Sequence, residues 1–216
     1  MNRGVSIGLS VAVLAGLAWG ALEFGRRWQG RWTGGGLLHG HRVTRMHYGD
    51  AVVAEAGERG LPAAYFLALI ELETGGRKPA GRRFERHIFE RLQAVQAGRR
   101  DRLENVTTAD LVGASEEALR NLATSWGPFQ LMGYKCIGLE VQIRDLRGPD
   151  AIAHGIRWID ETYGPRLRAG QFKDAFHVHN TGKPYPTTGP PTTYHPDYVE
   201  RGLAYMKRFE AELKTP

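Results

Sequence analysis

The sequence predicts a mainly α-helical protein, with a helical domain behind an N-terminal segment that crosses a membrane. Three observations support this organisation. The chain of 216 residues opens with 19 residues, Gly4 to Leu22, that carry no charge. From residue 48 onward, apolar residues recur at helical spacing, and no repeat or strand-rich region interrupts them. A stretch rich in glycine and arginine separates the two parts.

The uncharged segment has about the length that a helix needs to cross a bilayer. We therefore assign residues 1–24 to a transmembrane or signal-anchor segment that contacts the membrane through residues 4–22. A cleaved signal peptide is an alternative, although its apolar region is usually shorter. A buried core helix is another, although such a helix usually has a polar face. Arginines at positions 26, 27 and 31 outnumber Arg3, which favours a cytoplasmic C-terminal side.

Residues 25–47 are predicted to form a linker, because six glycines interrupt a run of arginines there. Three histidines, His39, His41 and His47, also lie in this stretch. No cysteine or carboxylate completes a metal site with them, so we expect solvated histidines and no bound metal. The domain is then expected to occupy residues 48–216.

The helices of this domain are predicted from apolar periodicity and from glycine and proline boundaries. They are Tyr48–Arg59, Pro62–Glu73, Ser115–Ala123, Pro149–Tyr163 and a last helix opened by Pro196. Gly60 and Gly164 are expected to end the first and fourth of these. Residues 183–196 hold five prolines and no apolar periodicity, so they are expected to form a loop.

Composition narrows the choice of partners without deciding it. Hydrophobic residues make up 42% of the chain, enough to bury a core, and the formal charge is +6. A basic surface suits a polyanion, whether nucleic acid, anionic lipid or an acidic wall polymer. No nucleic-acid motif accompanies the charge, so no nucleic-acid partner is expected. The lone Cys136 has no partner for an internal disulfide and is expected to be buried.

The stretch from Ala68 to Gly76 carries the first chemical signal. An apolar helix ends there in Glu73, followed by Thr74 and two glycines. A carboxyl at such a helix end is partly withheld from water, which raises its pKa and keeps a proton available for donation. Cleavage of a glycosidic bond needs such an acid on the leaving oxygen. Taken alone the signal is weak, because many helices end in glutamate followed by glycine.

Three further motifs follow in order along the chain. With the glutamate motif, the set is Glu73-Thr74-Gly75, Gly127-Pro128-Phe129-Gln130, His179-Asn180-Thr181-Gly182 and Tyr198-Val199. Together these four motifs resemble the lysozyme-like superfamily, within it the goose-type lysozymes and lytic transglycosylases. Phe84 to Phe89, before the string Ser125 to Gly133, is more narrowly similar to the N-acetylmuramidase family of phage lysins. The string Ser125 to Gly133 is predicted to join a glycine turn to a short apolar helix.

The resemblance covers about residues 50–213 and implies an α+β lysozyme-like fold. It implies that Glu73 is the proton donor and that Gln130 orients the sugar or the active-site loop. It also implies that Asn180 binds an N-acetyl group or shapes the cleft, next to Tyr198. The resemblance also makes His179 a candidate for binding a sugar, although it departs from the family by replacing the expected tyrosine.

Two aromatic residues, Trp126 and Phe129, offer apolar faces for sugar rings, with a plain core role open for Trp126. Glu85 is a candidate second catalytic carboxylate that positions a water on the far face of the sugar. It could equally pair with Arg86 or His87 to hold a loop.

The resemblance thus implies a peptidoglycan-degrading muramidase that cleaves the β-1,4 bond between N-acetylmuramic acid and N-acetylglucosamine and needs no cofactor. Its role would be phage lysis, as an endolysin, or wall remodelling. A lytic transglycosylase that leaves anhydro ends and a non-catalytic wall-binding protein are the alternatives. The enzyme would be exported or anchored in the inner membrane, with its catalytic domain in the periplasm or at the cell wall.

Overall fold

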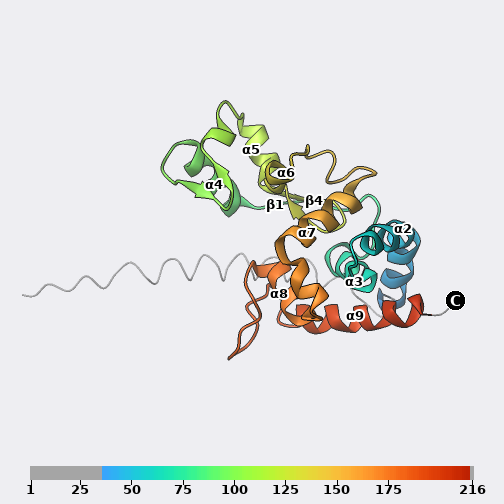
Figure 1. The fold of residues 1–216 in the computed structure, drawn as a ribbon. Coiled ribbons are helices and arrows are strands. Elements are labelled where there is room, and N and C mark those ends of the chain that lie inside the picture. The colour runs from blue at the N-terminus through green and yellow to red at the C-terminus, as the bar shows by residue number, and fades with distance from the viewer. Residues whose placement is uncertain (1–35, 215–216) are drawn as a thin grey trace, which may run out of the picture. The chain divides into compact units, whose positions relative to one another are not determined.

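Helices dominate the part of the chain that the structure, a computed structural model, describes, which is residues 36–214 (Figure 1). The helices are α2 (Gly36–Glu58), α3 (Ala63–Thr74), α4 (Arg86–Gln96), α5 (Glu116–Leu122), α6 (Lys135–Leu139), α7 (Ala151–Arg168), α8 (Phe172–Thr181) and α9 (Tyr198–Leu213). A short 3-10 turn spans Ala109–Leu111. The mainly helical prediction is confirmed.

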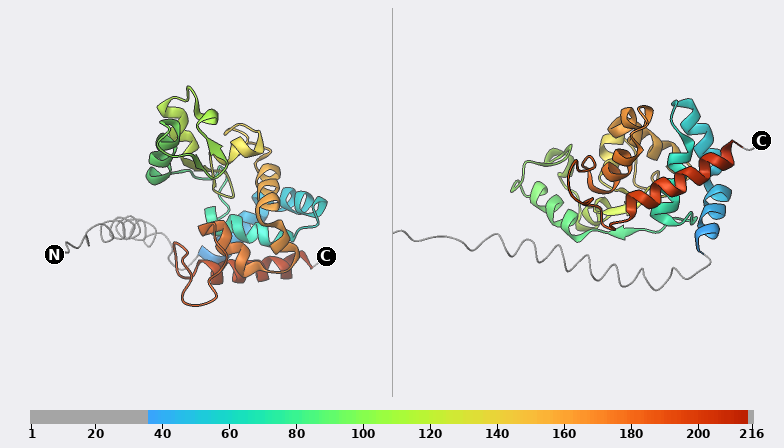
Figure 2. Two further views of the ribbon diagram at one scale, coloured as in Figure 1. Left: turned by 60° about the vertical axis from the view of Figure 1, so that its left-hand side comes forward. Right: turned by 90° about the horizontal axis from the view of Figure 1, so that it is seen from below.

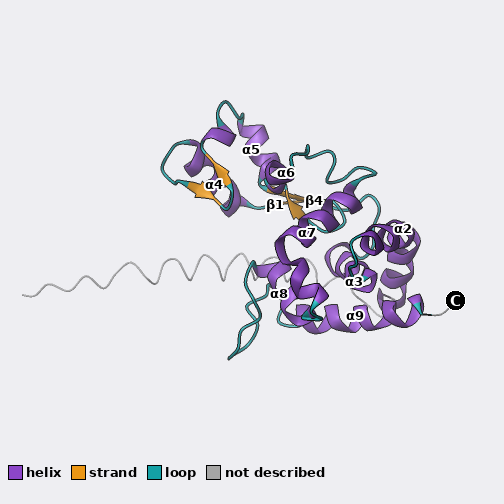
Figure 3. Ribbon diagram, in the orientation of Figure 1, coloured by secondary structure: helices purple, strands orange, loops and turns teal. Residues whose placement is uncertain are grey.

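Within residues 36–214, five short strands form two small antiparallel sheets (Figure 3). One sheet has the order β1–β4–β5, and the other pairs β2 with β3. Their bounds are β1 Arg83–Phe84, β2 Arg102–Leu103, β3 Val106–Thr107, β4 Thr124–Trp126 and β5 Leu131–Met132. In the first sheet Arg83 pairs with Ser125, and Ser125 pairs with Met132.

The predicted helices are present, with corrections at their boundaries. The linker prediction is wrong for its last part, because α2 begins at Gly36 and runs through the supposed linker. The helix predicted to stop at Gly164 does break at that point, because Tyr163 has non-helical backbone angles (φ −146°, ψ 20°). A second helical segment then continues to Arg168 as part of α7. Helices α4, α6 and α8 were not predicted.

The string Ser125 to Gly133 forms a β-hairpin, so the short helix predicted there is wrong. Two residues of its turn adopt positive φ angles, Gly127 (73°) and Gln130 (50°), and the Gln130 amide donates to the Gly127 carbonyl. Glycine is required at 127 because a Cβ would collide with the Leu146 carbonyl oxygen. The turn therefore folds tightly and brings β5 back beside β4.

The main core surrounds α3, whose side chains are nearly all buried. Helix α9 packs along α3, and α8 packs against both α7 and α9 (Figures 1 and 2). The largest fully buried side chains here are Tyr65, Phe66, Phe129, Tyr163, Phe176 and Phe209. Burial of each such aromatic or aliphatic group contributes about 1.5–3 kcal/mol. This core fixes the C-terminal end of α3, where Glu73 lies.

A second buried cluster lies between α4, α5 and the β2–β3 pair, and includes Leu92, Val95, Val106 and Leu111. A third, smaller one contains Trp126 and the buried Cys136, as predicted for that thiol. In the sequence, strand β1 lies between α3, which belongs to the main core, and α4, which belongs to the second cluster. Residues 75–85 thus connect the end of α3 to the second cluster.

The predicted membrane span, residues 4–22, lies outside the described residues. Among residues 36–214, no helix combines the length and apolar character that a membrane crossing requires.

Candidate active site

Glu73 occupies the last turn of α3 and is followed by Thr74 and two glycines. Gly75 ends the helix in the left-handed conformation (φ 62°), and its amide donates to the Glu71 carbonyl. Gly76 also has a positive φ (71°), and a Cβ there would lie 2.5 Å from the backbone nitrogen of Thr44 on α2. Because only glycine permits that approach, α2 packs tightly against the turn and fixes the position of Glu73.

The Glu73 side chain is mostly buried, with 18% of it exposed. Burial raises the pKa of its carboxyl to about 6. The hydroxyl of Tyr198 donates a hydrogen bond to Oε1, and the charge of Arg83 also favours the ionised form, so both lower this pKa. The result is a carboxyl that holds its proton in mildly acidic water while one end of α9 orients it.

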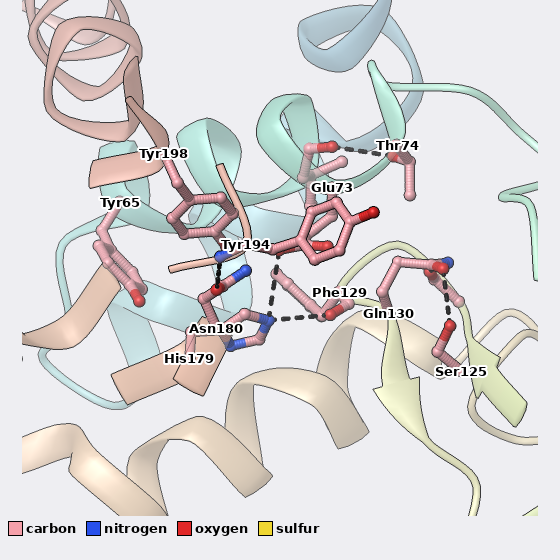
Figure 4. A network of polar contacts seen from close by, with 12 residues as sticks. Tyr65, Glu73, Thr74, Ser125, Phe129, Gln130, His179, Asn180, Tyr194 and Tyr198 are labelled. Atoms are coloured by element: carbon pink, nitrogen blue, oxygen red, sulfur yellow. Dashed lines mark hydrogen bonds and ion pairs between the residues drawn. The ribbon is translucent and has the colours of Figure 1, made fainter. Parts of the chain in front are cut away.

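His179 lies beside Glu73, with Nε2 4.0 Å from Glu73 Oε1 (Figure 4). Its Nε2 bonds the Phe129 carbonyl oxygen (3.0 Å), which can only accept, so Nε2 carries the hydrogen. Its Nδ1 then accepts from the Tyr163 hydroxyl (2.8 Å), which in turn accepts from Tyr65 (3.2 Å). Burial lowers the pKa of His179 to about 4, so the ring is neutral above that pH.

A neutral His179 has a consequence for its neighbour. An imidazolium 4.0 Å away would stabilise the Glu73 carboxylate and lower the pKa of that carboxyl. Because the imidazole is neutral, Glu73 keeps its raised pKa. The predicted sugar contact at 179 is wrong, since only 5% of the His179 side chain is exposed. His179 instead has a structural role, because its ring connects Tyr163 to the Phe129 carbonyl next to Glu73.

Asn180 joins two parts of the site. Its Oδ1 accepts from the backbone amide of Tyr194 (3.0 Å), and its side chain also hydrogen-bonds Tyr198. The phenol that bonds Glu73 is thereby tied to the loop that follows α8. Beside Asn180 lies an open hollow of about 390 Å³, lined by Asn180, Thr181, Lys183, Thr192 and Tyr194. Glu73 does not line this hollow itself.

The proline-rich loop, residues 183–196, is confirmed and is tied down by the buried His177. His177 Nδ1 donates to the Lys183 carbonyl (2.7 Å), and Nε2 accepts from the Thr192 amide (3.2 Å). Both ends of the loop are thus held to α8. The loop presents Tyr194 to the site, where the guanidinium of Arg83 lies 5.8 Å from the Tyr194 ring centroid.

The side-chain amide of Gln130 forms its hydrogen bonds within the protein. Its Oε1 accepts from the Ser125 hydroxyl (2.9 Å), and its Nε2 donates to the carbonyls of Gly81 (2.8 Å) and Gly127 (2.9 Å). These bonds lock the hairpin turn and tie it to the segment before β1. Of its two predicted roles, the contacts support orientation of a loop.

Glu85 precedes α4, and 18% of its side chain is exposed. It forms an ion pair with Arg83, and its Oε2 lies 3.7 Å from His87 Nδ1. Arg83 also acts on the pKa of Glu73, so one guanidinium is electrostatically coupled to both candidate carboxylates. The predicted pairing of Glu85 with His87 is present, and the predicted pairing with Arg86 is replaced by Arg86–Glu90.

The two aromatic candidates differ. Phe129 is 1% exposed and packs against Phe66, so its predicted role as a sugar platform is wrong. Its carbonyl serves the site instead, through His179. Trp126 is 5% exposed and donates from Nε1 to the Asn121 carbonyl, as a core residue does. It also forms part of the wall of a cavity away from Glu73.

Sequence reasoning missed four residues that shape the site: Tyr65, Arg83, Tyr163 and Tyr194. Arg83 stands directly before the quoted Phe84-Glu85 motif, and Tyr194 is an aromatic residue in a proline loop. Those contexts were available signals. Tyr65 and Tyr163 gave none, because a buried tyrosine resembles any other core residue. Within residues 36–214, no three His, Cys, Asp or Glu side chains gather as a potential metal site.

Comparison with known proteins supports the fold. No family model and no curated protein sequence matches the chain. A crystal structure of the Burkholderia AP3 phage endolysin is similar to it, with a TM-score of 0.52 and 19% sequence identity, over 75% of this chain and 70% of that one. The fold is endolysin-like. At this identity the likeness speaks for the fold and leaves the reaction to be argued from the site.

Proposed function

We propose that this chain degrades peptidoglycan by cleaving the β-1,4 bond between N-acetylmuramic acid and N-acetylglucosamine. The observation that carries the proposal is Glu73, a mostly buried carboxyl with a pKa of about 6, held by Tyr198 at the end of α3. The endolysin-like fold agrees with that use of the residue. A carboxyl of this kind is the acid that glycosidic cleavage requires.

In this mechanism Glu73 donates its proton to the glycosidic oxygen as the bond to the leaving sugar breaks. The reaction needs the protonated form, which predominates below about pH 6. Tyr198 holds one carboxyl oxygen, and the proton is donated from the other. The basic charge of the chain, +6, favours its approach to an acidic wall polymer.

Two routes can follow proton donation. In the hydrolytic route, water attacks the anomeric carbon with help from a second carboxylate, for which Glu85 is the candidate. In the transglycosylase route, the muramic acid's own C6 hydroxyl attacks and an anhydro end forms, so Glu73 also acts as the base. The ion pair between Glu85 and Arg83 favours this second route, because it engages the carboxylate that would have to hold the attacking water.

The new chain ends distinguish these routes. Purified cell walls are digested with the full chain, and the soluble products are analysed by mass spectrometry with and without borohydride reduction. Hydrolysis gives reducing ends that borohydride converts, whereas the transglycosylase gives anhydro ends lighter by one water. For a hydrolase, Glu85→Gln should lose about 10²–10⁴-fold in rate with an unchanged melt. For a transglycosylase, it should lose stability more than turnover. A digest without either kind of end overturns the proposed function.

The setting of the reaction is part of the same proposal. The uncharged segment, residues 4–22, would anchor or export the chain so that the domain reaches the wall, for phage lysis or for wall remodelling. A phosphatase that is active only in the periplasm, fused after residue 216, tests this directly. Activity in intact cells is expected, and an inactive fusion would place the domain on the cytoplasmic side.

A further inference from the structure

A second cavity lies away from Glu73, next to the hairpin turn. It has a volume of about 400 Å³, and its wall is formed by the middle of α2, by residues 78–82, by the β4–β5 turn and by the start of α7. The aromatic residues Tyr48 and Trp126 line it together with Pro79 and Pro149. None of the reacting groups described above lines this cavity, so the site mechanism does not account for it.

Three cations line the same cavity, each over an aromatic ring. Lys78 lies 5.8 Å from the Tyr48 ring centroid, while Arg82 and Arg147 lie 5.7 and 5.1 Å from the Trp126 ring centroid. All three side chains are exposed. Such cation–π contacts hold a charged group in place without neutralising it. The two guanidinium groups therefore stay beside one ring with their charge available.

No acidic group among the described residues forms an ion pair with these three cations. The residues that line the cavity include no aspartate or glutamate. Within residues 36–214, Lys78, Arg82 and Arg147 form no ion pair, although the structure forms ion pairs at many other arginines. Like charges gathered without a counter-charge repel one another, and a bound anion would relieve that repulsion. The wall also contains the first residues of α7, whose helix dipole favours an anion.

We infer that this cavity, built by Lys78, Arg82 and Arg147 around Trp126, binds the carboxylates of the peptides attached to muramic acid in peptidoglycan. This assignment rests on the proposed function, because that function makes the peptide-bearing glycan the substrate. Arg82 lines the cavity, and the next residue, Arg83, belongs to the catalytic site. A glycan strand seated at Glu73 would carry its peptide close to the muramic acid being cleaved. Arginine suits such a group, since its planar fork can hold a carboxylate through two hydrogen bonds.

The test is calorimetric binding of the free peptide, Ala-Glu-diaminopimelate, to the full chain. The variant Lys78→Gln/Arg82→Gln/Arg147→Gln should weaken binding about tenfold or more, through loss of charge-assisted hydrogen bonds. An amidated peptide, which lacks the carboxylates, should bind the wild type as weakly as the unmodified peptide binds the triple variant. The control Arg99→Gln, at an exposed arginine outside the cavity, should bind normally. A cooperative thermal melt of the triple variant checks that it is folded, as expected because the three replaced cations are exposed and form no ion pair.

Three outcomes would overturn the inference. They are equal binding by the triple variant, equal binding of the amidated peptide, and binding of inorganic phosphate without binding of the peptide. Failure here is separable from failure of the proposed function. If the wild type digests walls but does not bind the peptide, the cavity assignment falls alone. If it binds the peptide but digests no wall, the proposed reaction falls alone.

Discussion

Replacing Tyr198 by phenylalanine should move the alkaline limb of the pH–rate profile to higher pH. The Tyr198 hydroxyl donates to Glu73 Oε1 and so stabilises the carboxylate, which lowers the pKa of Glu73. Burial, the larger effect, remains in the variant. A hydrogen bond to a charged group is worth about 1.5–3 kcal/mol, and one pKa unit corresponds to about 1.4 kcal/mol. Its loss should therefore raise the pKa of Glu73 from about 6 by about one unit or more.

The assay is the pH dependence of kcat/KM, which reports the free enzyme's essential acid. Activity of the wild type should fall above about pH 6, and that of Tyr198→Phe should persist to about pH 7. The peak rate should drop, because the acid loses an orienting contact. The matched control is Tyr134→Phe, which removes a phenol bonded to a different carboxylate, Glu104. An alkaline limb in Tyr198→Phe that stays in place, or moves to lower pH, would refute this account of Glu73.

Two stability predictions follow. Glu71 is 1% exposed, and burial raises its carboxyl pKa to about 7, so stability should fall as pH rises from about 4.5 to about 7. At pH 8, Glu71→Gln should therefore have a higher free energy of unfolding than the wild type, by at most about 3 kcal/mol. At pH 4 the two proteins should be equally stable. An equal difference in stability at both pH values contradicts this. By circular dichroism, fragment 36–216 should fold, and fragment 48–216 should melt lower, because it lacks the buried Thr44. Equal melts would contradict the second prediction.

The end of α3 was predictable because its signals are local. An uninterrupted apolar run, a carboxylate and two glycines lie within a few residues of one another, and the structure uses them together. The last helix was predictable for the same reason, through its apolar periodicity. The resemblance made Glu73 and Tyr198 separate candidate site residues, and the structure joins them by a hydrogen bond.

The start of α2 was missed because glycine has two uses. From the sequence, Gly40 was predicted to be a linker residue, but it lies inside α2. A Cβ at this position would lie only 3.1 Å from Glu71 Oε1. A small residue there permits close packing of α2 on α3. Helix propensity alone disfavours glycine in a helix, and tertiary packing overrides it here.

The roles of Gln130 and His179 also depended on tertiary contacts. Gln130 adopts a positive φ that sequence rules assign to glycine, so the hairpin turn was taken for a helix. His179 was expected to face a sugar because of its motif. It points inward instead, since Tyr163, distant in sequence, supplies the hydroxyl that its Nδ1 accepts from. No spacing rule reveals such a pairing.

The central claim is that Glu73 supplies the proton that cleaves the glycan. Its most direct test is the release of soluble muropeptides from purified walls at about pH 5 by the full chain and by Glu73→Gln, each with a recorded melt. The amide keeps the shape and cannot donate that proton, so release should fall by about 10²–10⁴-fold at an unchanged melt. The control Glu90→Gln, at a carboxyl that is 60% exposed, should release muropeptides normally. Normal release by a folded Glu73→Gln would contradict the claim.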